Sequence, residues 1–319
     1  MLAARTPPGI CGLLAGAVLC TARLAGAQDL NPRAYLITPV GTNVVNLGYS
    51  HFEGNPDVAG AAPITEADAT LDLAALGYYQ SFALLGRSAN FALAIPYAVG
   101  EFTGIVAEAP KHASRSGFAD SSLRFSVNLI GGTAMGPKEF VSWQQDRLLG
   151  VSLKIVAPTG QYDPTKLINL GTNRWAFKPE IGYSQRWNHW VLDGYAGVWF
   201  FTTNPEFFSH NQSFPGDRSK TQSPVTALET HLSYDVRPRL WISLDANYWA
   251  GGEVSVNGVA NGASYQRSSR VGITASIPLT AHQSIKISYS DGAYVRYGGN
   301  YQELFASWQY GWLGWPQFH

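Results

Sequence analysis

Alternation between apolar and polar side chains, repeated along many short segments, is the feature that most constrains how this chain can fold. The clearest case is the segment 173–183. Its apolar side chains share one face of an extended chain: Trp175, Phe177, Ile181 and Tyr183. Its charged side chains share the other face: Arg174, Lys178 and Glu180. Successive side chains of a β-strand point to opposite faces, so this pattern predicts a strand with one apolar and one charged side.

Eleven more segments show the same period of two, which gives twelve expected strands. They are residues 44–52, 71–84, 91–99, 121–130, 149–157, 174–186, 190–201, 227–235, 240–249, 270–278, 284–290 and 304–312. Short connections such as 187–189 suit periplasmic turns, and long ones such as 202–224 suit external loops. Bacterial barrels built from one chain contain an even number of strands.

The first 27 residues have the pattern of a secretory signal peptide. Arg5 supplies positive charge, and residues 10–20 form an apolar run of about eleven residues, which is too short to span a bilayer. The small residues Ala25 and Ala27 frame a cleavage site, so we expect the mature chain to begin at Gln28. Residues 28–319 show no change of composition, and we expect them to form one barrel domain.

Composition after the leader limits the possible chemistry. Both cysteines, Cys11 and Cys20, lie in the leader, so the mature chain cannot form disulfides or bind a metal through thiolates. Removal of Arg5 and Arg23 leaves 20 basic and 22 acidic residues, a net charge of −2. Because there is no basic surplus, nucleic acid is not an expected partner. The 10 Trp, 16 Tyr and 15 Phe are typical of a barrel with aromatic girdles.

These observations predict an all-β fold, a transmembrane antiparallel up-and-down β-barrel of about 12 strands in the outer membrane of a Gram-negative bacterium. Its exterior would contact outer-membrane lipids. The alternating aromatic side chains of residues 304–312 are typical of the last strand of such barrels, which the barrel-assembly machinery reads. The pattern predicts no particular oligomeric state.

The residues on the polar faces of the strands are the candidates for the inner wall of the barrel. They are Arg174, Lys178, Glu180, Asp193, Trp199, Glu229, His231, Trp241, Asp245 and Arg270. The charged members allow two interpretations. They could filter solutes by charge, or they could form a salt-bridge ladder that fills the lumen. Asp245 would join Glu229 and His231 in a second polar cluster if their strands are neighbours.

The two tryptophans also allow two interpretations. Trp199 and Trp241 could provide a stacking path for an aromatic solute inside the lumen. Alternatively, a slip of one residue in strand register would turn each indole to the lipid girdle.

Neither a hydrolase nor a bound metal has a strong signal. His231 and nearby acids could belong to a catalytic triad, but no Gly-x-Ser-x-Gly motif occurs, and a lone lumen histidine is the simpler interpretation. Asp57 and Asp163 are isolated, whereas a calcium loop needs several acids at set spacing. We therefore expect no metal site, no cofactor and no enzyme.

Several segments resemble a known family. They are 31–35, 39–43, 45–49, 123–129, 157–163, 169–175, 177–182, 244–252 and 269–272. These segments are similar to the phenol-degradation MetA-pathway family of outer-membrane barrel proteins, often labelled transporters. The resemblance spans nearly the whole mature chain. It implies a barrel in the outer membrane and a role in the passage of aromatic or other hydrophobic compounds, and it carries no catalytic residues.

The expected function is therefore an outer-membrane channel for passive diffusion of small aromatic or hydrophobic compounds. The alternatives are a plugged structural barrel or an outer-membrane barrel enzyme that hydrolyses lipids.

Overall fold

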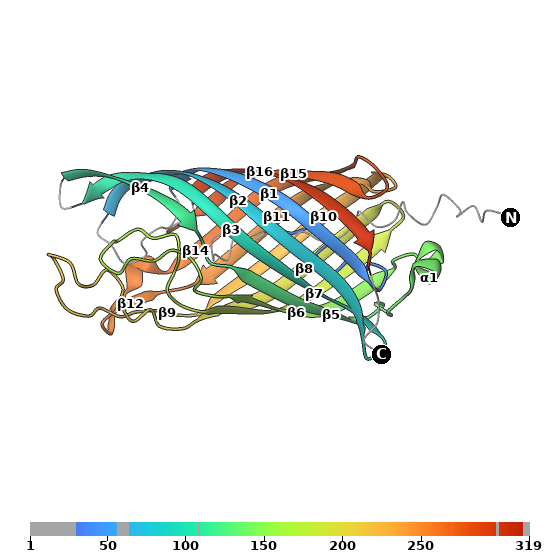
Figure 1. Cartoon of the computed structure of the whole chain (residues 1–319), viewed down its shortest axis with the longest axis horizontal. Coiled ribbons are helices and arrows are strands. Elements are labelled where there is room, and N and C mark those ends of the chain that lie inside the picture. The colour runs from blue at the N-terminus through green and yellow to red at the C-terminus, as the bar shows by residue number, and fades with distance from the viewer. Residues whose placement is uncertain (1–29, 56–63, 107–108, 298–299, 315–319) are drawn as a thin grey trace.

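In a computed structural model, which describes residues 30–55, 64–106, 109–297 and 300–314, the chain forms a closed antiparallel β-barrel (Figure 1). Twelve strands make the wall. They are β1 (Thr42–Asn55), β2 (Ile64–Leu84), β3 (Arg87–Val106), β5 (Ser122–Ile130), β6 (Arg147–Val156), β7 (Ala176–Trp187), β8 (Trp190–Phe201), β10 (Val225–Arg237), β11 (Leu240–Gly251), β14 (Gln266–Pro278), β15 (Gln283–Val295) and β16 (Asn300–Leu313). Pairing of β1 with β16 closes the cylinder. Each expected strand overlaps one of these strands, so the expected barrel is confirmed.

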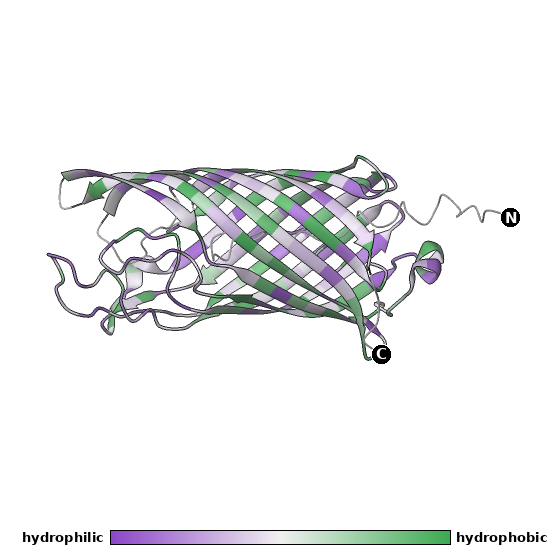
Figure 2. Ribbon diagram, viewed as in Figure 1, coloured by the Kyte–Doolittle hydropathy of each residue, from purple (hydrophilic) through white to green (hydrophobic). Residues whose placement is uncertain are grey.

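Closure satisfies the backbone of every wall strand without an exposed edge, which is what a lipid environment demands. Hydrophobic and hydrophilic residues alternate along the strands (Figure 2). On β11, for example, Ile242 and Leu244 are 46% and 63% exposed on the outside, whereas Trp241 and Asp245 are buried inside. No helix in the described part of the chain is long and apolar enough to cross a membrane.

The two ends of the barrel differ. Short turns, such as those between β7 and β8 and between β10 and β11, lie at one end of the barrel. The same end holds the first residue of β1, which is paired with the last residue of β16. The short helix α1 (Pro137–Ser142) lies at this end (Figure 1). The other end carries the long loops with the small sheet of β9 (Lys220–Gln222), β12 (Val254–Val256) and β13 (Val259–Asn261), and near it the 3-10 helix η2 (Gly262–Ser264). Short turns are periplasmic in such barrels, so the loop end is external.

The small sheet of β9, β12 and β13 was not expected from the sequence, and neither was one strand of the large sheet. β4 (Ala109–Phe118) pairs with the external half of β3, while β5 pairs with the other half. The two therefore form one interrupted strand, with the break at residues 119–121. β4 extends the wall of the barrel beyond the end of β6, on the external side.

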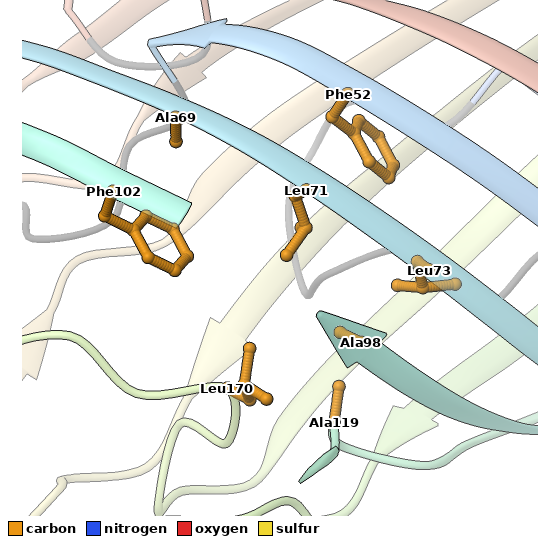
Figure 3. Packing of buried hydrophobic residues seen from close by; sticks show 8 residues of the cluster. All are labelled: Phe52, Ala69, Leu71, Leu73, Ala98, Phe102, Ala119 and Leu170. Carbon is orange, nitrogen blue, oxygen red and sulfur yellow. The ribbon is translucent and has the colours of Figure 1, made fainter. Parts of the chain in front are cut away.

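An apolar cluster covers part of the inner wall near this break. If every apolar side chain of a strand faced the lipid, Leu71 and Leu73 of β2 would point outward. Both are only 1% exposed and face inward. They pack with Phe102 of β3 and with Leu170, which reaches in from the external loop 157–175 (Figure 3). Leu170 thus anchors this loop inside the mouth of the barrel.

The last strand agrees with its expected pattern. On β16 the side chains of Trp308 and Tyr310 are exposed on the outside, with ring centroids 6.3 Å apart. Trp312 continues the row, with its ring centroid 5.9 Å from that of Tyr310. Phe318 and the expected signal peptide at residues 1–27 lie outside the described residues.

Candidate channel lumen

The segment 30–41, which precedes β1, lies inside the barrel rather than outside it. The backbone N–H of Arg33 donates to a carboxylate oxygen of Asp193 on β8, at 3.1 Å. The next N–H, of Ala34, donates to the hydroxyl of Tyr195 on the same strand, at 3.0 Å. These wall residues are buried. The segment therefore narrows the lumen from within.

Tyr35 fixes the middle of this segment against the wall. Its hydroxyl donates to Glu180 of β7 at 3.0 Å and lies 3.0 Å from the hydroxyl of Ser152 on β6. The ring rests on the backbone at Gly150 and Gly182, where the Cβ of any other residue would overlap ring atoms. Two glycines on neighbouring strands thus form the socket for one tyrosine ring.

Lys178 lies at the centre of a buried ionic chain. Its ammonium group is 2.7 Å from a carboxylate oxygen of Glu180 and 2.7 Å from one of Glu229 on β10. A guanidinium nitrogen of Arg124 on β5 lies 3.5 Å from Glu180. All four side chains are less than 10% exposed. Charges of opposite sign therefore follow one another around this part of the wall.

The chain continues through His231, because β10 and β11 are paired with His231 directly opposite Asp245. The Nδ1 atom of His231 lies 2.8 Å from Asp245, and its Nε2 atom lies 3.7 Å from Glu229. Ser243 and Thr274 donate to Asp245 at 2.7 and 2.6 Å. The expected cluster of Glu229, His231 and Asp245 is thus present.

This cluster does not have the contacts of a serine hydrolase. A triad needs a serine hydroxyl at the histidine nitrogen that the acid does not occupy. Here Nε2 of His231 faces the Glu229 carboxylate, and the Ser243 hydroxyl donates to Asp245 rather than to the histidine. Within the described part of the chain, the geometry suits a wall of paired charges.

Trp199 lies on the inner wall of β8 and is 1% exposed. The ammonium groups of Lys154 and Lys178 lie 5.6 and 5.9 Å from its ring centroid, within the range of cation–π contacts. Its ring stacks with that of Phe201 at 6.3 Å. The alternative of a register slip toward the lipid is wrong for this residue.

Trp241 is 4% exposed, on the inner side of β11, and the guanidinium carbon of Arg33 lies 4.6 Å from its ring centroid. A register slip is wrong here too. Trp249, eight positions further along the same strand, is also fully buried on the inside. Trp249 was not among the residues expected in the lumen, although its even spacing from Trp241 places both on one face of the strand.

Arg270 and Arg174 are expected lumen residues that do not belong to the ionic chain. Arg270 on β14 is fully buried, and its guanidinium donates to Ser290 at 3.0 Å and to the carbonyl oxygen of Tyr301 at 2.9 Å. Arg174 was expected within a strand that also carries Lys178, and this is wrong. β7 starts at Ala176, and Arg174 stacks at 4.4 Å on the ring of Phe201 near the external end.

Several inner residues were not among the candidates. Arg124, Lys154 and Tyr195 occupy the polar faces of their strands, so their alternation could have identified them. Arg33 and Tyr35 belong to an irregular segment whose position no periodicity reveals.

Residues 38–304 match the model of the protein family described as "Putative MetA-pathway of phenol degradation". No curated protein matches the chain significantly. A solved structure, the COG4313 outer membrane channel from Pseudomonas putida F1, has a TM-score of 0.72 and 18% identity, covering 89% of this chain and 100% of that one. The β domain of the Bordetella autotransporter BrkA has a TM-score of 0.48 and 10% identity, covering 85% and 100%.

The first of these likenesses supports the barrel fold, and the second is too weak to carry an argument. The fold and its apolar exterior place the protein in the outer membrane of a Gram-negative bacterium. The family model covers most of the sequence, and the chain therefore belongs to the phenol-degradation MetA-pathway family.

Proposed function

We propose that this barrel is a channel for the passive diffusion of small aromatic or hydrophobic compounds across the outer membrane. The observation that carries the proposal is the inner-wall indole of Trp199 beneath Lys154 and Lys178. The ring is 1% exposed, so an aromatic solute stacks on it, or offers its own face to the ammonium groups, as the side chains that cover the ring move aside. The family to which the chain belongs and the channel fold support the same function.

The paired charges on the wall suit this role. Arg124 and Lys178 balance the charges of Glu180 and Glu229, so the fields of the four groups largely cancel at a distance. A small neutral ring can therefore pass without strong attraction or repulsion. The charged residues named from the sequence would set ion preference rather than bind the solute.

A plugged structural barrel is the second candidate, and residues 30–41 favour it because they are hydrogen-bonded across the inside. In the channel that we propose, this segment instead narrows the passage and restricts it to small solutes.

Liposome swelling separates these candidates. Liposomes containing the mature barrel should swell faster in catechol than in arabinose, after subtraction of the rates for protein-free liposomes. Trp199→Leu should slow catechol entry and leave arabinose entry unchanged. Swelling no faster than that of protein-free liposomes with either solute would indicate a plugged barrel. Release of fatty acid from a lipid ester by the purified protein would indicate a hydrolase.

A further inference from the structure

A pocket of about 670 Å³ lies at the periplasmic end of the barrel. It is formed by residues 33–38 of the inner segment, by residues in and after α1, and by the turns that follow β7 and β10. Pockets that hold small molecules typically measure about 300–1,000 Å³, so this one is large enough for a single-ring solute. Any solute that leaves the lumen toward the periplasm would pass it.

One side of the pocket is apolar and aromatic. Phe140 of α1 and Trp143 just after it stack with ring centroids 5.6 Å apart. Both pack with Ile37 of the inner segment and with Leu148 of β6. Trp143 lines the pocket and is only partly buried, so its ring is available to a ligand.

The other side is rich in arginine. Arg33, Arg186, Arg237 and Arg239 line the pocket, and Asp235 is the one carboxylate among its lining residues. Asp235 is shared by Arg33 and Arg186, at 2.7 and 2.6 Å. Because one carboxylate serves two guanidinium groups, the pocket has a surplus of positive charge.

Two of these arginines have no carboxylate partner among the residues that the structure describes. Arg239 donates to the carbonyl oxygens of Thr280 and Gln283, at 2.7 and 3.3 Å, which leaves its charge uncompensated. Arg237 is exposed, and it forms no ion pair with any residue that the structure describes. A guanidinium binds a carboxylate through two parallel hydrogen bonds, so Arg237 is the side chain best placed to accept an anion from solvent.

We propose that this pocket binds a small aromatic carboxylate, with its ring against Trp143 and its carboxylate at Arg237. The inference rests on the proposed function and extends it, since it adds aromatic acids to the neutral aromatic compounds as solutes that the channel delivers to the periplasm. The aromatic wall distinguishes this site from a simple anion site. The arginines distinguish it from a site for neutral phenols.

Isothermal titration calorimetry on the detergent-solubilised mature barrel tests this, with benzoate, phenol and inorganic phosphate as probes. Benzoate should bind saturably and at least about tenfold more tightly than phenol or phosphate. A hydrogen bond to a charged group strengthens binding by about ten- to a hundredfold. Arg237→Gln should weaken benzoate by about tenfold and leave phenol unchanged. Trp143→Leu should weaken both benzoate and phenol.

Arg147→Gln is the matched control, because Arg147 is an exposed arginine at the same end of the barrel that does not line the pocket. It should bind benzoate like the wild type. Absence of saturable benzoate binding would overturn the proposal, and so would equal loss of affinity in the Arg237 and Arg147 variants. If phosphate bound as tightly as benzoate, the pocket would be a general anion site, and this result would also reject the proposal. Because binding is measured without flux, a barrel that binds benzoate and transports nothing would reject the channel and keep the site.

Discussion

A guanidinium nitrogen of Arg33 lies 2.7 Å from a carboxylate oxygen of Asp235, which ties the inner segment to the wall at the periplasmic end. The second oxygen of Asp235 lies 2.6 Å from Arg186. One carboxylate on β10 therefore holds an arginine from the inner segment and another from β7. The lumen owes its narrowing to this contact and to the socket around Tyr35.

Replacement of Asp235 by Asn should release the start of the inner segment. Two arginines would lose their shared partner, and we expect the free energy of unfolding to fall by about 3 kcal/mol or less, since the site is partly exposed. Ion conductance should rise as the segment loosens. Urea unfolding in lipid vesicles and planar-bilayer recordings would measure both effects. Asp217→Asn, which removes an exposed external pair with His210, should change neither quantity.

Gly182→Ala should expel the ring of Tyr35 from its socket. The added Cβ would overlap the ring, and such overpacking costs about 1–3 kcal/mol unless the ring moves away. Trypsin should then cleave faster after Arg33, which is 8% exposed in the intact structure. Gly194→Ala is the control, because a Cβ there meets no atom within 4 Å. Equal cleavage rates in the two variants would show that the tyrosine socket does not hold the segment.

Lys178→Met should leave Glu229 without its close cation. Removal of one member of a buried ion pair costs about 3–5 kcal/mol, and the negative charge that remains should favour cations in the lumen. Reversal potentials in a salt gradient and unfolding in urea would report the two effects. Adding Glu229→Gln should restore part of both. Arg174→Ala should have a smaller effect, because Arg174 lies before β7 near the external loops, and a larger effect than that of Lys178→Met would contradict this assignment.

Asp163 in the external loop provides a test by pH. The N–H and hydroxyl of Thr165 donate to one carboxylate oxygen at 3.0 and 2.6 Å, and Lys166 lies 3.0 Å from the other. These hydrogen bonds lower the pKa of Asp163 to about 2. The pKa of Asp163 is lower in the folded protein than in the unfolded chain, so its ionised carboxylate stabilises the loop fully above about pH 4. This stabilisation is lost as the pH falls toward about 2.

A carboxyl ¹³C NMR titration would measure this midpoint directly. Thr165→Val removes the hydroxyl donor, so it should raise the pKa of Asp163 toward the ordinary aspartate value. A wild-type midpoint at the ordinary value, unaffected by Thr165→Val, would show that these hydrogen bonds are not formed in solution.

Period-two alternation was sufficient to predict the wall of the barrel and the charged inner residues of β7, β8, β10 and β11. Lys178, Glu229, His231 and Asp245 meet because strand neighbours follow one another along the chain, so a local pattern also specified the contacts between strands. Trp199 was placed inside by the same alternation. The strand expected to begin at Arg174 begins two residues later, at Ala176, because the alternating pattern extends beyond the hydrogen-bonded strand.

The inner segment could not be placed from the sequence. Arg33 and Tyr35 lie in an irregular stretch, and their partners Asp235 and Glu180 are far away along the chain. No local pattern encodes such contacts. The inward apolar face at Leu71 and Leu73 was equally hidden, because its partner Leu170 comes from a distant loop.

In the proposed channel, aromatic solutes enter the lumen and contact the indole of Trp199 as the lysine side chains over its ring move aside. The most direct test is the current through single barrels in a planar bilayer, with phenol or arabinose added. Phenol alone should interrupt the current briefly, and the interruptions should be about two- to tenfold shorter in Trp199→Leu, the range expected for one aromatic contact. Interruptions of equal length in wild type and variant, or none with phenol, would contradict it.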